Sequence, residues 1–311
     1  MPDFVHKPVM MAEVLAALSP RPGGRYIDGT IGGAGHAAAL LAASSPTGWL
    51  FGCDRDGAAV EAAQTRLAPF AGRWEIRRGN FADLADWVAA GGCDGALLDL
   101  GVSSPQLDVP ERGFSFQHDG PLDMRMDTRQ TLTAADLVNR AGADELARLF
   151  WELGDERDSR RLARAIVRER ESGNVRFSTT RSLAELIERV SPRAGRRSHP
   201  ATKVFQALRL AVNDEIGSLK RGLDAVFGRL KSGGRLAVIT FHSLEDRVVK
   251  EFGRGRTRDY TVTGGVDVPE LRAPRVPEAQ WINRKAIKPG AVELAENPRS
   301  RSAQLRVLQK I

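Results

Sequence analysis

The chain has 311 residues, of which 42% are hydrophobic and 27% charged, as is ordinary for a globular protein of one large domain or two. No apolar run approaches the ~20 residues that a membrane-spanning helix needs, and the first residues lack the pattern of a secretory signal. We therefore expect a cytoplasmic protein with no membrane partner. The only cysteines, Cys53 and Cys93, are far apart and lie in or beside apolar runs, which favours buried free thiols over disulfides or a metal site.

Charge is spread unevenly along the chain. The net charge is +7, but residues 1–108 carry 8 basic and 12 acidic side chains, whereas residues 251–311 carry 12 and 7. Of the 46 basic residues, 38 are arginine, which binds phosphate in a bidentate manner. This distribution suits a polyanionic partner, most simply nucleic acid. A compositional bias combined with solvated helix faces explains the charge equally well.

Short apolar strands alternate with helices in the first third of the chain. After an amphipathic helix at residues 10–18, strands are expected at about 26–28, 49–54, 74–78 and 95–98, with helices starting at Ala37 and covering 57–67 and 82–90. This alternation predicts a parallel α/β sheet. Ligands of such sheets bind at the carboxyl ends of the strands, where Asp28, Asp54, Phe81 and Asp99 fall.

A glycine-rich turn follows the first strand. Gly29, Gly32, Gly33 and Gly35 precede a helix start, so the backbone can bend sharply and offer free N–H groups to a ligand. The turn therefore predicts a site for a nucleotide-like cofactor. The pattern G-x-G-x-x-A at residues 33–38 also matches the dinucleotide fingerprint loosely, which is a weak signal.

Two acidic strand ends favour S-adenosylmethionine as the cofactor. Asp28 can reach the amino-acid end of that molecule, and the dinucleotide fingerprint has no need of such a residue. Asp54 can accept both ribose hydroxyl protons, but both cofactor classes use a carboxylate there. A nicotinamide-dependent oxidoreductase stays open as an alternative, and so does a purely turn-forming role for Asp28.

The alternation stops after the fourth strand. We expect a discontinuous α/β domain of residues 1–108 and 206–311, with an inserted helical domain of residues 109–205. The later part of the α/β domain is expected to contain one long helix at 202–230 and a fifth strand at 235–241. A mobile loop at 253–277 and an antiparallel pair of strands at 281–287 and 302–309 complete the prediction.

The turn after the fourth strand carries the candidate reacting group. Asp99 ends the strand at the position where methyltransferases of this architecture keep their reacting group. Many that methylate exocyclic amines carry an Asn/Asp/Ser-Pro-Pro-aromatic turn there, and this chain has the acidic acceptor but no Pro-Pro-aromatic sequence. The lone pair of an aryl amine is delocalised, so acceptors for its N–H protons favour the pyramidal nitrogen that attacks a methyl group. The site is compatible with amine methylation. A plain turn in which Ser104 and Pro105 start a helix is the alternative.

The chain resembles the ribosomal RNA small subunit methyltransferase H family, also known as MraW. The resemblance rests on long segments that span nearly the whole chain: Asp28 to His36, Asp54 to Asp56, Asp99 to Asp108, Arg112 to Phe116, Pro121 to Asp127, Phe205 to Arg209, Phe241 to Arg247 and Asn297 to Ser302. Departures are small: Ala34 stands where many relatives have glycine, and Gly154-Asp155-Glu156 replaces Gly-Glu-Glu.

The resemblance implies a class I S-adenosylmethionine-dependent methyltransferase, with a Rossmann-like sheet and an inserted helical domain. It implies N4-methylation of one cytidine in the decoding region of 16S rRNA, within the small ribosomal subunit, and no metal. It also implies cofactor contacts from Ala34, Gly35, His36, Asp54, Phe81, Asp99 and Gln106.

Four points stay open from the sequence alone. Asp99 is the candidate catalytic acceptor. His242, Ser243, Glu245 and Asp246 follow the fifth strand and either shape a cytidine pocket or cap the next helix, Ser243 and Asp246 resembling a capping box. A ribosome-assembly protein that binds RNA without catalysis is a further alternative, and a homodimer is compatible with the sequence.

Overall fold

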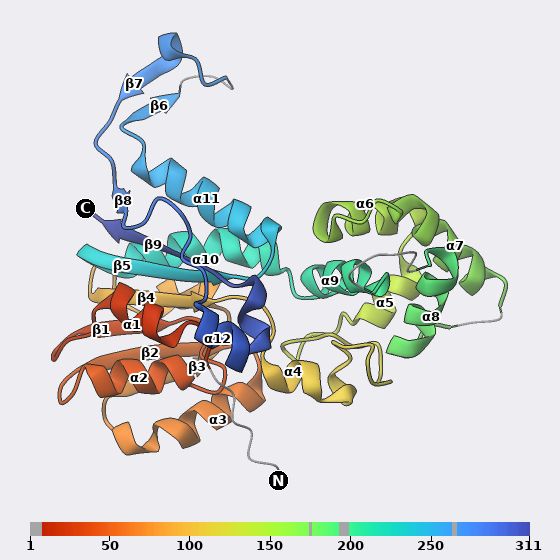
Figure 1. Cartoon of the computed structure of the whole chain (residues 1–311), viewed down its shortest axis with the longest axis horizontal. Coiled ribbons are helices and arrows are strands. Elements are labelled where there is room, and N and C mark those ends of the chain that lie inside the picture. The colour runs from red at the N-terminus through yellow and green to blue at the C-terminus, as the bar shows by residue number, and fades with distance from the viewer. Residues whose placement is uncertain (1–7, 174–175, 193–198, 263–265) are drawn as a thin grey trace. The chain divides into compact units, whose positions relative to one another are not determined.

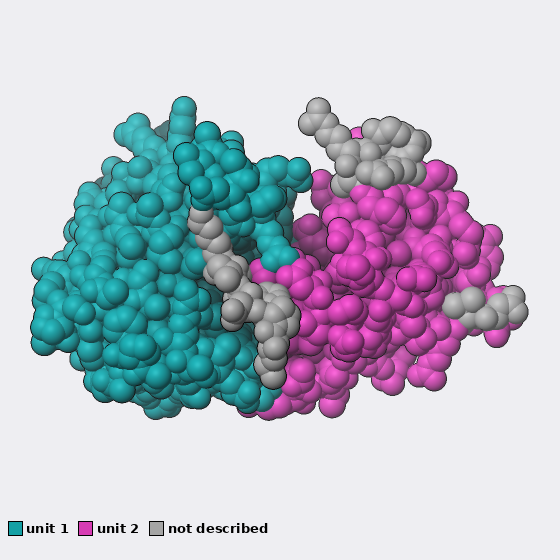
Figure 2. Space-filling model, turned by 60° about the horizontal axis from the view of Figure 1, so that its bottom comes forward, with its two compact units in different colours: residues 1–101, 216–311 teal, residues 102–215 magenta. Residues whose placement is uncertain are grey.

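A computed structural model of the chain describes residues 8–173, 176–192, 199–262 and 266–311. The chain forms two compact units, one of residues 1–101 and 216–311 and the other of residues 102–215 (Figure 2). Each unit has buried hydrophobic clusters of its own. The division into domains at residues 109 and 205 stays a prediction.

The first unit is built on a seven-stranded sheet in the order β3-β2-β1-β4-β5-β9-β8 (Figure 1). Strands β1 to β5 are parallel, and β9 runs antiparallel to both of its neighbours. The chain builds outward from β1 to β3 and then returns to place β4 on the other side of β1, so the strand order reverses at β1. The strands are β1 (Arg25–Asp28), β2 (Trp49–Asp54), β3 (Trp74–Arg78), β4 (Cys93–Asp99), β5 (Leu230–Thr240), β8 (Ala279–Trp281) and β9 (Gln304–Lys310).

Helices cover both faces of this sheet because successive strand residues point to opposite sides. Tyr26 and Leu97 belong to one buried cluster, whereas the adjacent Ile27 and Leu98 belong to the other. The first cluster is completed by α1 (Met11–Leu18), α2 (Gly35–Ala43) and α3 (Gly57–Leu67), the second by α10 (Glu215–Arg229) and α11 (Ser243–Thr257). The predicted Rossmann-like α/β fold is confirmed.

Two expectations for this unit are wrong in detail. The helix expected at 82–90 is a short 3-10 helix, η2 (Phe81–Asp86). In the segment expected as a loop, α11 continues to Thr257, and β6 (Tyr260–Val262) pairs with β7 (Arg272–Pro274) after the short η4 (Pro269–Leu271). Arg256 explains the helical extension, because it forms ion pairs with Asp224 and Glu278 that no local pattern reveals.

The last predicted strand pair is also only partly right. The partner of β9 is the three-residue β8, which ends where the predicted strand begins. Within that segment Trp281 pairs with Leu308 as the last residue of β8, and Ile282 N–H donates to the Val307 carbonyl at 3.0 Å. Ile287 forms an isolated bridge to Leu305. Two short helices follow, α12 (Ala291–Glu296) and η5 (Pro298–Ser302).

The second unit is helical, as predicted for this part of the chain. Phe150, Phe177, Leu183 and Leu208 are among the side chains at the centre of its buried cluster. No helix among the described residues of either unit is long and apolar enough to cross a membrane. The helices are α4 (Ser104–Asp108), η3 (Pro110–Arg112), α5 (Ala134–Arg140), α6 (Ala143–Gly154), α7 (Ser159–Glu171), α8 (Thr180–Val190) and α9 (Ala201–Val212).

The single long helix expected at 202–230 is wrong: α9 ends at Val212 and α10 begins at Glu215. Asp214 adopts a left-handed backbone conformation with φ 45°, which a continuing α-helix does not allow. The side chain of the buried Asn213 accepts a hydrogen bond from Met126 N–H at 2.8 Å and donates to the Met124 carbonyl at 2.8 Å. These tertiary hydrogen bonds favour the break over helical continuation.

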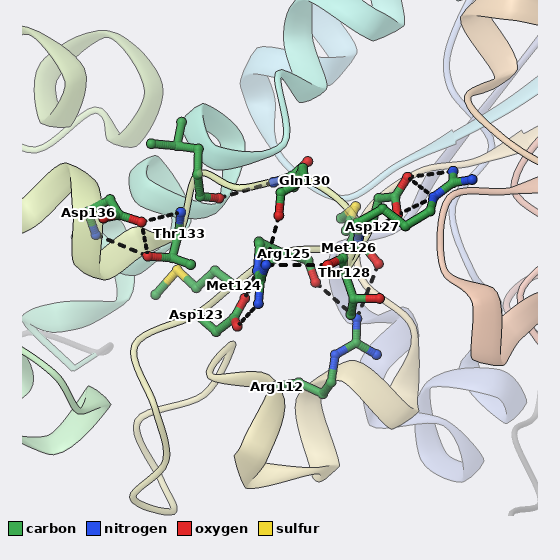
Figure 3. A network of polar contacts seen from close by, with 12 residues as sticks. Arg112, Asp123, Met124, Arg125, Met126, Asp127, Thr128, Gln130, Thr133 and Asp136 are labelled. Atoms are coloured by element: carbon green, nitrogen blue, oxygen red, sulfur yellow. Dashed lines mark hydrogen bonds and ion pairs between the residues drawn. The ribbon is translucent and has the colours of Figure 1, made fainter.

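The segment that Asn213 contacts is held by a polar network (Figure 3). Arg125 donates two hydrogen bonds to the Asp123 carboxylate, at 2.8 and 2.7 Å, and a third to the Gln130 carbonyl at 2.7 Å. Arg112 donates to the Arg125 carbonyl at 3.0 Å. The segment Pro121 to Asp127, which carried part of the family resemblance, is therefore an irregular loop fixed by arginine side chains.

Asn213→Ala should destabilise the protein by about 2–4 kcal/mol, because it leaves the Met124 carbonyl and the Met126 N–H without these partners in a buried position. Asn213→Asp keeps the acceptor oxygen and loses the donor, so its cost should be intermediate. Urea unfolding followed by circular dichroism measures both. Equal stability of the two variants and the wild type would contradict the structural role of Asn213.

Candidate functional site

Three carboxylates meet at the carboxyl edge of the sheet. Strands β2, β1 and β4 are adjacent and parallel, and each ends on an aspartate: Asp54, Asp28 and Asp99. The glycine-rich turn is hydrogen-bonded to both neighbouring strands, from Gly29 N–H to the Leu97 carbonyl and from Ile31 N–H to the Cys53 carbonyl, each at 3.0 Å. The turn and the acidic strand ends therefore lie together at this edge of the sheet, and their role as a cofactor site stays a prediction.

Asp54 ties the turn to the end of β2. One carboxylate oxygen accepts the Gly32 N–H at 3.0 Å, and the other accepts the Asp56 N–H at 2.9 Å. Each oxygen has a further lone pair, so the carboxylate can still accept protons from a diol. Burial raises the pKa of Asp54, while these two backbone hydrogen bonds oppose the rise.

Ala34 is the residue that caps α2. It is fully buried and holds a left-handed backbone conformation with φ 57°, so this position favours glycine sterically. Its N–H donates to the Ile31 carbonyl at 2.7 Å, which closes the turn before the helix begins. The first N–H groups of α2, at Gly35 and His36, lie directly after it.

His36 is held beside Asp99 by the segment before α1. Its Nε2 lies 2.9 Å from the Val9 carbonyl oxygen, a contact that requires Nε2–H to be the donor. Nδ1 lies 3.7 Å from Oδ2 of Asp99. Pro8 packs against Gly35, where an added Cβ would lie 2.2 Å from the Pro8 Cγ. Nothing in the sequence marked Pro8 and Val9 as part of this site.

Asp99 is the most unusual group of the site. Its N–H donates to Thr30 Oγ1 at 2.7 Å, but its buried Oδ1 accepts no hydrogen bond from any described residue. Burial raises the pKa of Asp99 well above its usual range, and the nearby carboxylates of Asp28, Glu245 and Glu293 raise it further. A buried carboxylate oxygen without a donor fits a cationic or N–H-bearing ligand.

Asp28 is 1% exposed and accepts one hydrogen bond, from Thr30 N–H at 3.3 Å. Burial raises the pKa of Asp28 to about 7, with a further contribution from Asp54. Like charges crowded in a low-dielectric site keep part of the cluster protonated. Among the described residues no group of three or more His, Cys, Asp or Glu is arranged to hold a metal ion.

The remaining predicted residues differ in their surroundings. Phe81 is half-buried, and its ring packs against Gly222 of α10, where an added Cβ would lie 2.2 Å away. Gln106 belongs to the other compact unit, where it forms a capping box with Ser103 at the start of α4. Cofactor contacts from both residues stay predictions.

The cap of α11 lies one residue earlier than expected. His242, and not Ser243, is the N-cap, and Glu245 accepts the Phe241 N–H at 2.8 Å. Asp246 pairs instead with Arg306 of β9 at 2.6 Å and with Lys250 at 3.2 Å. Helix capping thus accounts for His242 and Glu245, and ion pairing accounts for Asp246.

Sequence reasoning also missed Glu293. Its Oε1 accepts the Met10 N–H at 2.7 Å, and its charge contributes to the raised pKa of Asp99. It lies on α12, in a region where strands and loops were expected, and no local motif marks it.

Comparisons with known proteins show the family of this chain. The profile of the MraW methylase family matches residues 3–311. The chain belongs to the MraW methylase family. A relative from Geobacter sulfurreducens, named ribosomal RNA small subunit methyltransferase H, is 51% identical over 313 residues, 99% of each chain. A relative of the same name from Symbiobacterium thermophilum is 49% identical and covers 99% of this chain and 97% of its own.

Membership of the MraW family identifies the protein as a methyltransferase and its α/β unit as the class I methyltransferase fold. Family membership therefore excludes the two alternatives left open by the sequence, a nicotinamide-dependent oxidoreductase and a protein that binds RNA without catalysis. A solved rRNA methylase from Streptococcus thermophilus aligns over 99% of both chains, but at 12% identity and a TM-score of 0.44 the likeness adds nothing to the assignment.

Asp28→Asn should change how stability depends on pH. The pKa of Asp28 is about 7 in the folded chain and about 4 in an unfolded one. The folded state therefore binds more protons between these pH values, and its stability falls as the pH rises through them. Asparagine cannot ionise, so the stability of the variant lacks this fall. Between pH 4 and pH 8 the free energy of unfolding of the variant should therefore rise, relative to that of the wild type, by on the order of a few kcal/mol.

Urea unfolding of both proteins at several pH values measures this difference. Asp83→Asn, at an exposed position on η2, is the matched control and should follow the wild type. Parallel curves for the wild type and Asp28→Asn would show that Asp28 is ionised in the folded protein at low pH.

Gly35→Ala should cost about 1–3 kcal/mol, because the new Cβ must displace Pro8 and disturb the Val9 carbonyl that holds His36. Gly33→Ala is the control in the same turn, since no heavy atom lies within 4 Å of an added Cβ there. Thermal unfolding of the two variants measures the effect. A loss of stability in Gly33→Ala as large as in Gly35→Ala would contradict it.

Proposed function

We propose that this chain transfers a methyl group from S-adenosylmethionine to N4 of one cytidine in the decoding region of 16S rRNA, acting on the small ribosomal subunit. Two relatives that align over nearly their full length, at 51% and 49% identity, are named ribosomal RNA small subunit methyltransferase H, which supports rRNA as the substrate. The observation that carries the chemistry is the buried Oδ1 of Asp99, which has no donor among the described residues and lies at the end of β4.

The acidic edge suits the charge of the cofactor. S-adenosylmethionine carries a sulfonium and an ammonium group, and when bound it supplies an electrophilic methyl. Asp54 would accept the ribose hydroxyl protons, and Asp28 with Asp99 would face the cationic part. The first N–H groups of α2, after Ala34 at Gly35 and His36, would bind the carboxylate. Phe81 and Gln106 complete the proposed set of contacts.

The Asp99 carboxylate would also orient the target amine. By accepting a hydrogen bond from the amine N–H, the carboxylate favours a pyramidal nitrogen whose lone pair can attack the methyl group. This orientation supplies most of the catalysis. The methylated nitrogen is cationic and loses a proton readily, so no strong base is needed. The base has to leave its stack to reach such a site.

The proposal is tested by transfer of labelled methyl to three substrates: small subunits that lack the modification, deproteinised 16S rRNA and DNA. Mass spectrometry of the nucleosides locates the label. We expect N4-methylcytidine at one site in the subunits and none in DNA. Label in a different nucleoside or in protein would overturn the assignment of the amine.

Asp99→Asn should reduce transfer at saturating cofactor at least about a hundredfold, because the amide cannot offer the same acceptor to the amine. Asp94→Asn is the matched control. Asp94 lies on the same strand at the opposite edge of the sheet, where it pairs with Arg21 and Lys231, so its loss should leave kcat nearly unchanged. Near-normal turnover of Asp99→Asn would show that another group orients the cytidine.

A further inference from the structure

The second unit carries a groove of about 730 Å³ that the site described above does not use. It is formed by α6, α7 and the residues between them, two helices that lie side by side (Figure 1). Five arginines and one tryptophan dominate its lining: Arg148, Trp151, Arg157, Arg160, Arg161 and Arg164.

Trp151 is an exposed aromatic side chain in this groove. It is 56% exposed, although tryptophan is largely buried in most proteins. Arg148 lies one helical turn before it on α6, so a cationic side chain and a flat ring share one face of the helix. A ring presented in this way is available for stacking.

Most of the positive charge in the groove is not neutralised. In the described part of the chain, no hydrogen bond or ion pair involves the side chains of Arg148, Arg157 or Arg160, and all three are exposed. Arg161 pairs with Asp158 at 2.9 Å, and Asp158 also accepts a hydrogen bond from Ser191 Oγ. Asp144 is the other acidic residue of the lining, so five cations face two anions.

A second hollow of this unit differs in this respect. Arg140, Arg170 and Arg176 line it. Arg140 pairs with Asp136 at 3.0 Å and Arg170 donates to the Val138 carbonyl at 2.9 Å, while Arg176 is exposed. Two of its three arginines are therefore used within the fold, whereas three of the five arginines of the α6–α7 groove have no such contact among the described residues.

We propose that the α6–α7 groove binds an unpaired segment of the substrate rRNA, with Trp151 stacking on one base and Arg148, Arg157 and Arg160 binding its phosphates. The inference rests on the proposed function and names the surface that grips the substrate. Alternating stacking rings and cations are the means by which proteins hold single-stranded nucleic acid. An acidic peptide would satisfy the arginines but would leave the exposed ring without a flat partner.

The test measures binding of the full chain to deproteinised 16S rRNA and to small subunits, at several salt concentrations. Trp151→Ala should weaken both roughly tenfold or more, while Trp151→Phe keeps most of the affinity because it keeps a stacking ring. The triple variant with Arg148→Gln, Arg157→Gln and Arg160→Gln should make the negative slope of log affinity against log salt shallower by about two.

Two exposed residues of the same unit that do not line the groove serve as controls, Glu152→Ala on α6 and Arg181→Gln on α8. Both should bind RNA like the wild type. Cofactor affinity should be unchanged in every variant, and Trp151→Ala should raise the KM for subunits more than it lowers kcat.

The outcomes separate this inference from the proposed function. If the wild type methylates subunits and Trp151→Ala binds RNA equally well, the groove is not the RNA site and the function stands. If Trp151→Ala weakens binding to subunits but not to deproteinised RNA, the groove binds a ribosomal protein instead. If the wild type binds no rRNA, both proposals fall.

Discussion

The site depends on the convergence of three carboxylates at one edge of a parallel sheet. Because β2, β1 and β4 are neighbours in register, Asp54, Asp28 and Asp99 cannot be separated without breaking strand pairs. The backbone offsets their repulsion unequally: Asp54 accepts two N–H groups, Asp28 one, and Oδ1 of Asp99 none from the described residues. Burial raises the pKa of Asp28 and Asp99, and the remaining repulsion between the carboxylates raises it further. A cationic ligand would relieve that repulsion.

Sequence patterns predicted the features that depend on local periodicity. Strand ends, the glycine turn and most helices of both units follow from alternation, caps and turn residues. Long-range contacts decided the rest. Asn213 ends α9 through hydrogen bonds to residues about ninety positions earlier, and Arg256 extends α11 through ion pairs with Asp224 and Glu278.

The same limit applies to the site. Asp28, Asp54 and Asp99 could be found because each ends an apolar run, and Ala34 and Gly35 because they lie in a glycine-rich turn. Val9 and Glu293 approach from segments far away in the sequence, and neither belongs to a recognisable motif. Composition also could not distinguish arginines used inside the fold, such as Arg125, from those left exposed, such as Arg160.

The arrangement of the two units along the chain has a consequence for biosynthesis. Residues 102–215 form one continuous stretch with a buried cluster of its own. The sheet of the other unit, by contrast, places β9 between β5 and β8, so it is incomplete until residues 304–310 have been made. During synthesis the inserted unit can therefore finish folding while the edge of β5 is still unpaired. The ribosome makes residues 102–215 before it makes β9, so the unit of residues 1–101 and 216–311 is the last to complete its fold.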